Sequence, residues 1–250
     1  RIVCNVDADN FAGKGFAYYV AENLEPNKVL TGCRIKDNGD LDVYKDEGSV
    51  GRICAFREAF HDAGGFDEMM ESWGFEDLDL YERLRDLGYE LAPVKEKFKR
   101  PLWHDDGERV ANVENKHIGR ETVYSAGTCY EHGLISKENR ENGRFRANLE
   151  GYGMGTVTAF GEKQRKIEVK PFQYRKISYC ITCMNRLHHL METLPQNIED
   201  NRNYPNQEFV VLDYNSSEDL EGWMRSEMGN HIESGLVKFF KTSDPNNFIK

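Results

Sequence analysis

The sequence lacks a long hydrophobic run, has few cysteines and has less positive than negative charge. No stretch approaches the roughly 18 to 20 consecutive apolar residues that a membrane-spanning helix needs. The 6 cysteines are too sparse for a disulfide scaffold in 250 residues, which predicts a reducing, cytoplasmic location and leaves peripheral contact with a membrane surface open. The 33 Lys and Arg against 43 Asp and Glu give a net charge of −10, which disfavours nucleic acid as a partner.

The remaining composition is that of a globular protein. A hydrophobic content of 39% with 12% aromatic residues is enough for a sizeable core, and a charged fraction of 30% argues against a fibrous or disordered chain. The length corresponds to about 1.7 domains, so one large domain and two small ones are both open.

Short apolar runs alternate with helical periods along the first part of the chain. We expect strands at 2–6, 28–35, 41–44, 51–56 and 89–94, and helices at 15–24, 57–63, 76–87 and 118–132. Residues 142–155 are rich in Gly and Asn and give no clear pattern, and the charged stretch 161–176 is typical of a linker.

After this stretch the pattern starts again. Strands are expected at 177–183, 208–212 and 236–240 and helices at 187–197 and 218–228, the β-α-β-α-β order of a nucleotide-binding half-sheet. Cys180 and Cys183 fall on opposite faces of one such strand, which favours buried, inert thiols. The run from Cys129 to His132 has half of a zinc spacing but no second pair, so we do not assign a metal to it.

Two acidic clusters follow predicted strands or begin predicted helices. Asp7 and Asp9 come directly after the first strand, where two carboxylates can bind Mg²⁺ or Mn²⁺; the alternative is a solvated turn. Glu76 and Asp77 begin a helix after Trp73 and Gly74, and here the alternative is ordinary N-terminal capping. The helix dipole would then lower the pKa of Asp77.

These clusters, taken in order, resemble the C-terminal half of GT-A glycosyltransferases, in particular family 2 enzymes and the galactosyltransferase-like group. The resemblance rests on the segments Asn5–Asp9, Gly64–Asp67 and Trp73–Asp79, followed by His104. It implies a GT-A, Rossmann-like α/β fold with a mostly parallel central sheet flanked by helices.

The resemblance also implies roles for individual residues. Asp9 would bind a Mn²⁺ or Mg²⁺ ion directly, His104 would complete the metal shell, and Asp7 would contact the metal or the ribose. Asp77 would be the general base, and Glu76 and Gly74 would lie at the acceptor side with Trp73 stacked on the acceptor sugar. In the second half, Asn185 and Arg186 resemble a uridine-contacting turn, and Asp213 and Asn215 the end of the strand that reads the base.

The order of the segments departs from the family. In GT-A enzymes the nucleotide-binding segments precede the Asp-x-Asp strand, whereas here they follow it by about 170 residues. We therefore expect 1–160 to be the Asp-x-Asp and acceptor-side half of a GT-A domain, 161–176 a linker, and 177–250 the nucleotide-binding half. A circular permutation, a junction of two tandem domains and segments outside their native order are all compatible with this.

The sequence thus predicts a metal-dependent glycosyltransferase that moves a sugar from a nucleotide-diphosphate donor, by preference a UDP-sugar, to a hydroxyl of a carbohydrate or glycoconjugate, with inversion. A retaining enzyme similar to N-acetylgalactosaminyltransferases is one alternative. A non-catalytic nucleotide-sugar-binding module is another. If the two halves pair between molecules, the functional unit would be a domain-swapped homodimer.

Overall fold

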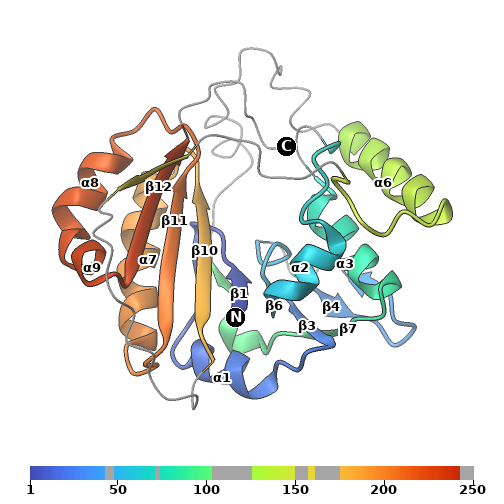
Figure 1. Cartoon of the computed structure of the whole chain (residues 1–250), viewed down its shortest axis with the longest axis horizontal. Coiled ribbons are helices and arrows are strands. Elements are labelled where there is room, and N and C mark those ends of the chain that lie inside the picture. Colours follow the sequence, from blue (N-terminus) through green and yellow to red (C-terminus); the bar gives the residue numbers. More distant parts are fainter. Residues whose placement is uncertain (43–47, 71–73, 103–125, 150–156, 161–174, 243–250) are drawn as a thin grey trace.

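The protein is built on one large mixed sheet with helices packed against it (Figure 1). The computed structural model describes residues 1–42, 48–70, 74–102, 126–149, 157–160 and 175–242. The eight strands of this sheet follow the order β7 (Glu90–Pro93), β3 (Lys28–Thr31), β6 (Ile53–Phe56), β1 (Ile2–Asn5), β10 (Ile177–Cys183), β11 (Gln207–Asp213), β12 (Val237–Thr242), β9 (Val157–Phe160). Two short pairs, β2 (Asn10–Phe11) with β8 (Arg100–Pro101) and β4 (Arg34–Ile35) with β5 (Leu41–Asp42), lie outside it.

Most strands of the sheet run in the same direction. Only β6 and β9 are antiparallel to the strands beside them. The predicted α/β class with a mostly parallel central sheet is therefore confirmed.

The beginning of the chain and its last third share this sheet. β1 pairs in parallel with β10, from Ile2 beside Ile177 to Asn5 beside Cys180. Below the sheet the same two parts share one hydrophobic core, in which Phe16 contacts Tyr179 and Tyr179 stacks on Phe209 with ring centroids 4.5 Å apart. Residues 177–242 thus pack against residues 1–24 of the same molecule.

Helices cover both parts of the sheet. The helices are α1 (Phe16–Asn23), α2 (Arg57–Ala63), α3 (Glu76–Asp86), the 3-10 helix η1 (Glu96–Phe98), α6 (Ala126–Glu141), α7 (Leu187–Asn201), α8 (Leu220–Glu227) and α9 (Gly229–Ser234). Figure 1 shows α7, α8 and α9 beside the β10–β12 part and α2, α3 and α6 on the other side of β1. A second core joins α2 and α3 to β3 and β6.

Alternation along β10 explains its two cysteines. Ile177, Tyr179, Ile181 and Cys183 are buried on one face, whereas Cys180 lies on the other face beside the exposed Thr182. Burial raises the pKa of the Cys180 thiol to about 11 and that of Cys183 to about 12. Both thiols are therefore protonated at neutral pH, whereas the thiolate is the reactive form, and this agrees with the prediction of inert thiols.

Several predicted boundaries are wrong. The helix predicted at 118–132 continues to Glu141, because Arg140 bonds Asp86 of α3 and stabilises its last turn; residues 118–125 lie outside the described part. α7 continues through Pro195 to Asn201, since buried hydrogen bonds of its last turns offset the missing proline N–H. Five short elements, β2, β8, β9, η1 and α9, were not predicted, because two to six residues are too few to show a clear pattern.

Candidate active site

The residues predicted at strand ends meet at one edge of the sheet. β1, β10 and β11 are consecutive parallel neighbours, so their carboxyl ends lie side by side. Asp7 follows β1, Asn185 follows β10, and Asp213 ends β11. In open α/β sheets ligands bind at this edge, which makes it the candidate site.

Asp9 is held by two side chains. Its Oδ2 accepts a hydrogen bond from Arg186 Nη1 at 2.6 Å, and its Oδ1 accepts one from Asn10 Nδ2 at 2.7 Å. Asp9 is 4% exposed. The Asp9–Arg186 ion pair therefore joins the loop after β1 to the turn before α7, two segments about 177 residues apart.

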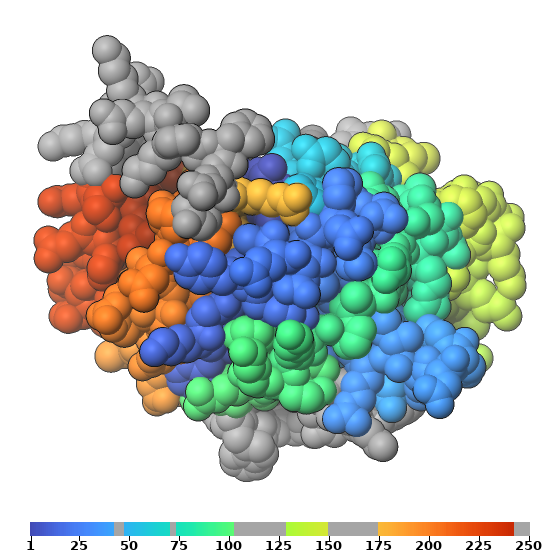
Figure 2. Space-filling view, turned by 90° about the horizontal axis from the view of Figure 1, so that it is seen from below, coloured from blue at the N-terminus to red at the C-terminus, as the bar shows by residue number. Residues whose placement is uncertain are grey.

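A polar face of α7 fixes the loop that carries Asp9. Thr193, Asn197 and Asn201 are spaced by four residues, lie on one side of the helix and are buried. All three bond backbone groups of residues 8–17, and the Asn197 amide both accepts from Ala12 N and donates to Asn10 O. Figure 2 shows this contact from below, where the N-terminal segment in blue adjoins α7 in orange. We did not predict this role, although the four-residue spacing was visible.

Asp77 faces Asp7 across Gly51. A Cβ placed on Gly51 would be 3.1 Å from Asp77 Oδ2 and 3.2 Å from Asp7 Oδ2, so both carboxylates border the same small space. The backbone at Gly51 is fixed, because Asn5 Nδ2 donates to its carbonyl at 3.0 Å and the Tyr81 hydroxyl donates to the carbonyls on either side. The structure thus brings together two carboxylates that lie 70 residues apart.

Burial raises the pKa values of this carboxylate cluster. The pKa of Asp77 lies well above its ordinary value, mainly because of burial and further because of the nearby Glu76 and Asp7 charges. The expectation that the helix dipole lowers it is wrong, since desolvation and like charges outweigh the dipole. Burial also raises the pKa of Glu76, whose buried Oε2 has no hydrogen-bond partner among the described residues. Burial and the Asp9 charge raise the pKa of Asp7 to about 6.

This shift of Asp7 predicts how stability changes with pH. A carboxyl with a folded pKa of about 6 and an unfolded pKa of about 3.9 binds more protons in the folded state, so its ionisation destabilises the fold as the pH rises through this window. We expect Asp7→Asn to raise the free energy of unfolding by about 2–3 kcal/mol at pH 7.5 and the gain to vanish towards pH 4. Urea unfolding of the wild type and of Asp7→Asn at several pH values measures this difference in the free energy of unfolding. A difference that does not change with pH would contradict the raised pKa of Asp7.

α6 supports the turn in front of Asp77. His132 Nδ1 lies 2.6 Å from the carbonyl oxygen of Gly74, and a Cβ on Gly74 would be 3.3 Å from the Cys129 side chain. The buried His132 also lowers the pKa of Glu76, against the larger effect of burial. Cys129 and His132, which have half of a zinc spacing, therefore pack against this turn. Within the turn, Phe75 just before α3 has a left-handed backbone with φ 76°.

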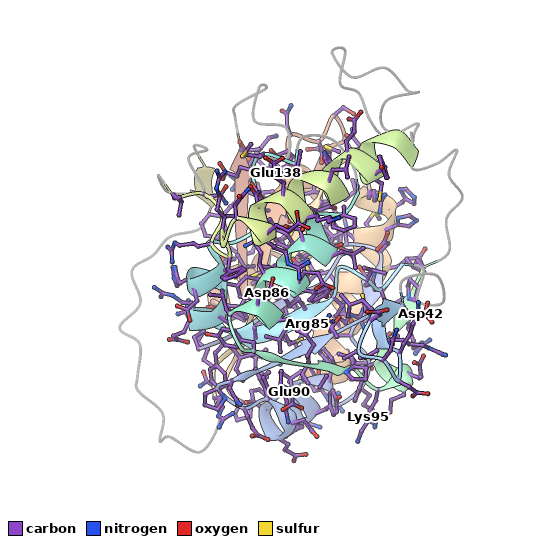
Figure 3. The ribbon with its side chains drawn as sticks, turned by 90° about the vertical axis from the view of Figure 1, so that its right-hand side faces the viewer. Asp42, Arg85, Asp86, Glu90, Lys95 and Glu138 are labelled. Atoms are coloured by element: carbon purple, nitrogen blue, oxygen red, sulfur yellow. The ribbon has the colours of Figure 1, made fainter. Side chains whose placement is uncertain are left out.

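Asp79 and the Gly64–Asp67 segment have a structural role. The fully buried Asp79 accepts a hydrogen bond from Arg83 Nε at 2.7 Å, and Arg83 also donates to the carbonyls of Ala63 and Gly65. Figure 3 labels the neighbouring α3 residues Arg85 and Asp86, and Asp86 pairs with Arg140 of α6. The buried Asp79–Arg83 pair holds α3, and with it Asp77, against the end of α2.

The predicted nucleotide-side residues fasten two turns to each other. Asn185 Oδ1 accepts a hydrogen bond from Ser217 N at 2.7 Å, and Asp213 Oδ1 accepts one from Ser216 N at 2.9 Å. Asp213 is fully buried, with its Oδ2 3.7 Å from Lys241 Nζ. Asn215, like Asn185, has a positive φ and shapes its turn. These contacts place the turns that carry Asn185, Asp213 and Asn215 at the candidate site. That these residues contact a nucleotide stays a prediction.

Two predicted residues, Trp73 and His104, lie outside the described part of the chain. Within the part that is described, no group of three His, Cys, Asp or Glu side chains is arranged to hold a metal ion. No described helix is both long and apolar enough to cross a membrane.

One comparison with known proteins, with protein families, found a match. Residues 43–104 match the family model described as the N-terminal domain of galactosyltransferase, a segment that includes Gly51, Glu76 and Asp77. Neither the curated proteins nor the solved structures gave a match. The family match indicates a galactosyltransferase-like glycosyltransferase domain, and the chain is therefore a glycosyltransferase enzyme.

Proposed function

We propose that the protein transfers a sugar from a nucleotide-diphosphate donor, by preference a UDP-sugar, to an acceptor hydroxyl, with inversion and with the help of a divalent cation. The observation that carries this proposal is the pair Asp7 and Asp77, which border one space at the carboxyl end of β1 beside Gly51. The family match to residues 43–104 supports glycosyl transfer as the reaction.

The donor set of the site fits Mn²⁺ or Mg²⁺. Asp7 and Asp9 offer carboxylate oxygens, the ligands that hard divalent cations prefer. The pKa of Asp7 is raised mainly by burial and secondly by the Asp9 charge, and a cation would offset both effects. We propose these two residues and His104 as the ligands. When bound, the cation neutralises the diphosphate leaving group.

Asp77 is proposed as the general base. Its Oδ2 faces Gly51, whose lack of a side chain leaves room beside the carboxylate, and there it would accept the proton of an acceptor hydroxyl. A general base works best when its pKa is near the operating pH, and burial beside Glu76 and Asp7 moves the pKa of Asp77 in that direction. A single base opposite the leaving group gives inversion at the anomeric carbon. Glu76 would bind the acceptor through Oε2, which has no hydrogen-bond partner in the described part of the chain.

The nucleotide would lie over the ends of β10 and β11. Two asparagines with left-handed backbone, Asn185 and Asn215, shape the turns there. Arg186 is a positive side chain at this edge and is 24% exposed, which suits contact with a diphosphate.

The test is a donor and acceptor panel with Mn²⁺. Release of UDP that depends on both an acceptor and a divalent cation supports the proposal, and NMR of the product should show an anomeric configuration opposite to that of the donor. Retention of configuration would contradict the role of Asp77 as base. If UDP and Mn²⁺ bind but no donor turns over, the chain is a binding module and the proposal is wrong.

A further inference from the structure

The Asp9 carboxylate is already neutralised by a protein cation. Its Oδ2 contacts Arg186 Nη1 at 2.6 Å and its Oδ1 accepts from Asn10 at 2.7 Å, so both oxygens bind hydrogen-bond donors. Because the Asp9 side chain is only 6% exposed, water has little access to replace these two hydrogen bonds. A divalent cation that binds Asp9 directly must therefore compete with the guanidinium.

We propose that Arg186 is a resident counter-ion of Asp9 that weakens divalent-cation binding until a nucleotide diphosphate takes Arg186 away. The inference rests on the proposed function, because it assigns Asp9 as a metal ligand. A guanidinium beside a bound divalent cation is repelled by it. A diphosphate offers Arg186 a bidentate anionic partner at the same edge of the sheet, so the two ligands favour each other's binding.

The other nearby arginine is not suited to this exchange. Arg52 is 1% exposed and fixed by bonds from Nη2 to Asn10 Oδ1 at 2.8 Å and to Phe11 O at 3.1 Å. Arg186 instead lies at the N-cap of α7 with 24% of its side chain exposed, so it can turn towards a ligand without disturbing the core. Arg186 is therefore the cation that a divalent metal ion would replace beside Asp9.

Calorimetric titration with Mn²⁺, with and without saturating UDP, tests the proposal on the full chain. For the wild type we expect UDP to tighten Mn²⁺ binding by about tenfold or more. Arg186→Gln should bind Mn²⁺ alone about tenfold more tightly than the wild type, so UDP should increase its Mn²⁺ affinity less than it increases that of the wild type. Arg186→Lys keeps the charge and should stay close to the wild type in Mn²⁺ binding without UDP.

The control is Arg202→Gln. Arg202 follows the other end of α7 and pairs with Glu199 on the surface, so its loss should leave both affinities unchanged. The proposal is overturned if Arg186→Gln binds Mn²⁺ no more tightly than the wild type, or if Arg186→Gln and Arg186→Lys bind it equally. Either result, obtained with a wild type that binds Mn²⁺ and transfers sugar, leaves the proposed function intact. If the wild type binds no Mn²⁺ even with UDP, the metal-dependent function fails as well.

Discussion

Asp77→Asn is expected to reduce kcat for sugar transfer by about 10²–10⁴-fold while the affinity for UDP stays close to that of the wild type. The amide occupies the same space beside Gly51 but cannot accept the acceptor proton. The fold should tolerate the change, because burial and the Glu76 and Asp7 charges already disfavour the ionised form of Asp77. Steady-state kinetics and UDP titration measure the two effects separately.

Asp37→Asn is the matched control for Asp77→Asn. Asp37 is exposed in the turn between β4 and β5, a strand pair outside the main sheet, so the kinetics of this variant should equal those of the wild type. Asp7→Asn gives a different pattern, since it should weaken Mn²⁺ binding as well as turnover. If Asp77→Asn transfers sugar at the wild-type rate, Asp77 is not the general base.

Arg83→Met is expected to lower the free energy of unfolding by about 3–5 kcal/mol. The substitution leaves Asp79 buried without its cation and removes the donors to the carbonyls of Ala63 and Gly65. Because both ends of this interaction are fully buried, water cannot replace it. Urea unfolding at pH 7.5, followed by circular dichroism, gives the value.

Arg85→Met on the same helix is its control. Arg85 contacts Glu82 at 3.4 Å, and its side chain is 35% exposed, so we expect a loss below about 1 kcal/mol. Similar losses for the two variants would show that the buried Asp79–Arg83 pair contributes no more than a surface pair. A large loss for Arg83→Met together with reduced turnover would agree with α3 positioning Asp77.

The sequence indicated which residues to consider and on which elements they lie. Period-two and helical patterns correctly placed the strands beginning near Ile2 and Ile177 and the helix from Glu76, because these segments bury one face and their apolar spacing records it. The ends of α6 and α7 were missed, because tertiary bonds of Arg140 and Asn201 stabilise turns that have little apolar pattern.

The sequence by itself determined the α/β class, the acidic residues at the strand and helix ends, and the placement of Cys180 and Cys183 on opposite faces of one strand. Only the tertiary structure decided that residues 177–242 complete the sheet beside β1 of the same chain. It also decided that Arg186 pairs with Asp9 and that Asp77 faces Asp7. The pKa of Asp77 was misjudged for the same reason. A helix dipole is a local property that the sequence shows, whereas desolvation and the charge of a residue 70 positions away exist only once the chain has folded.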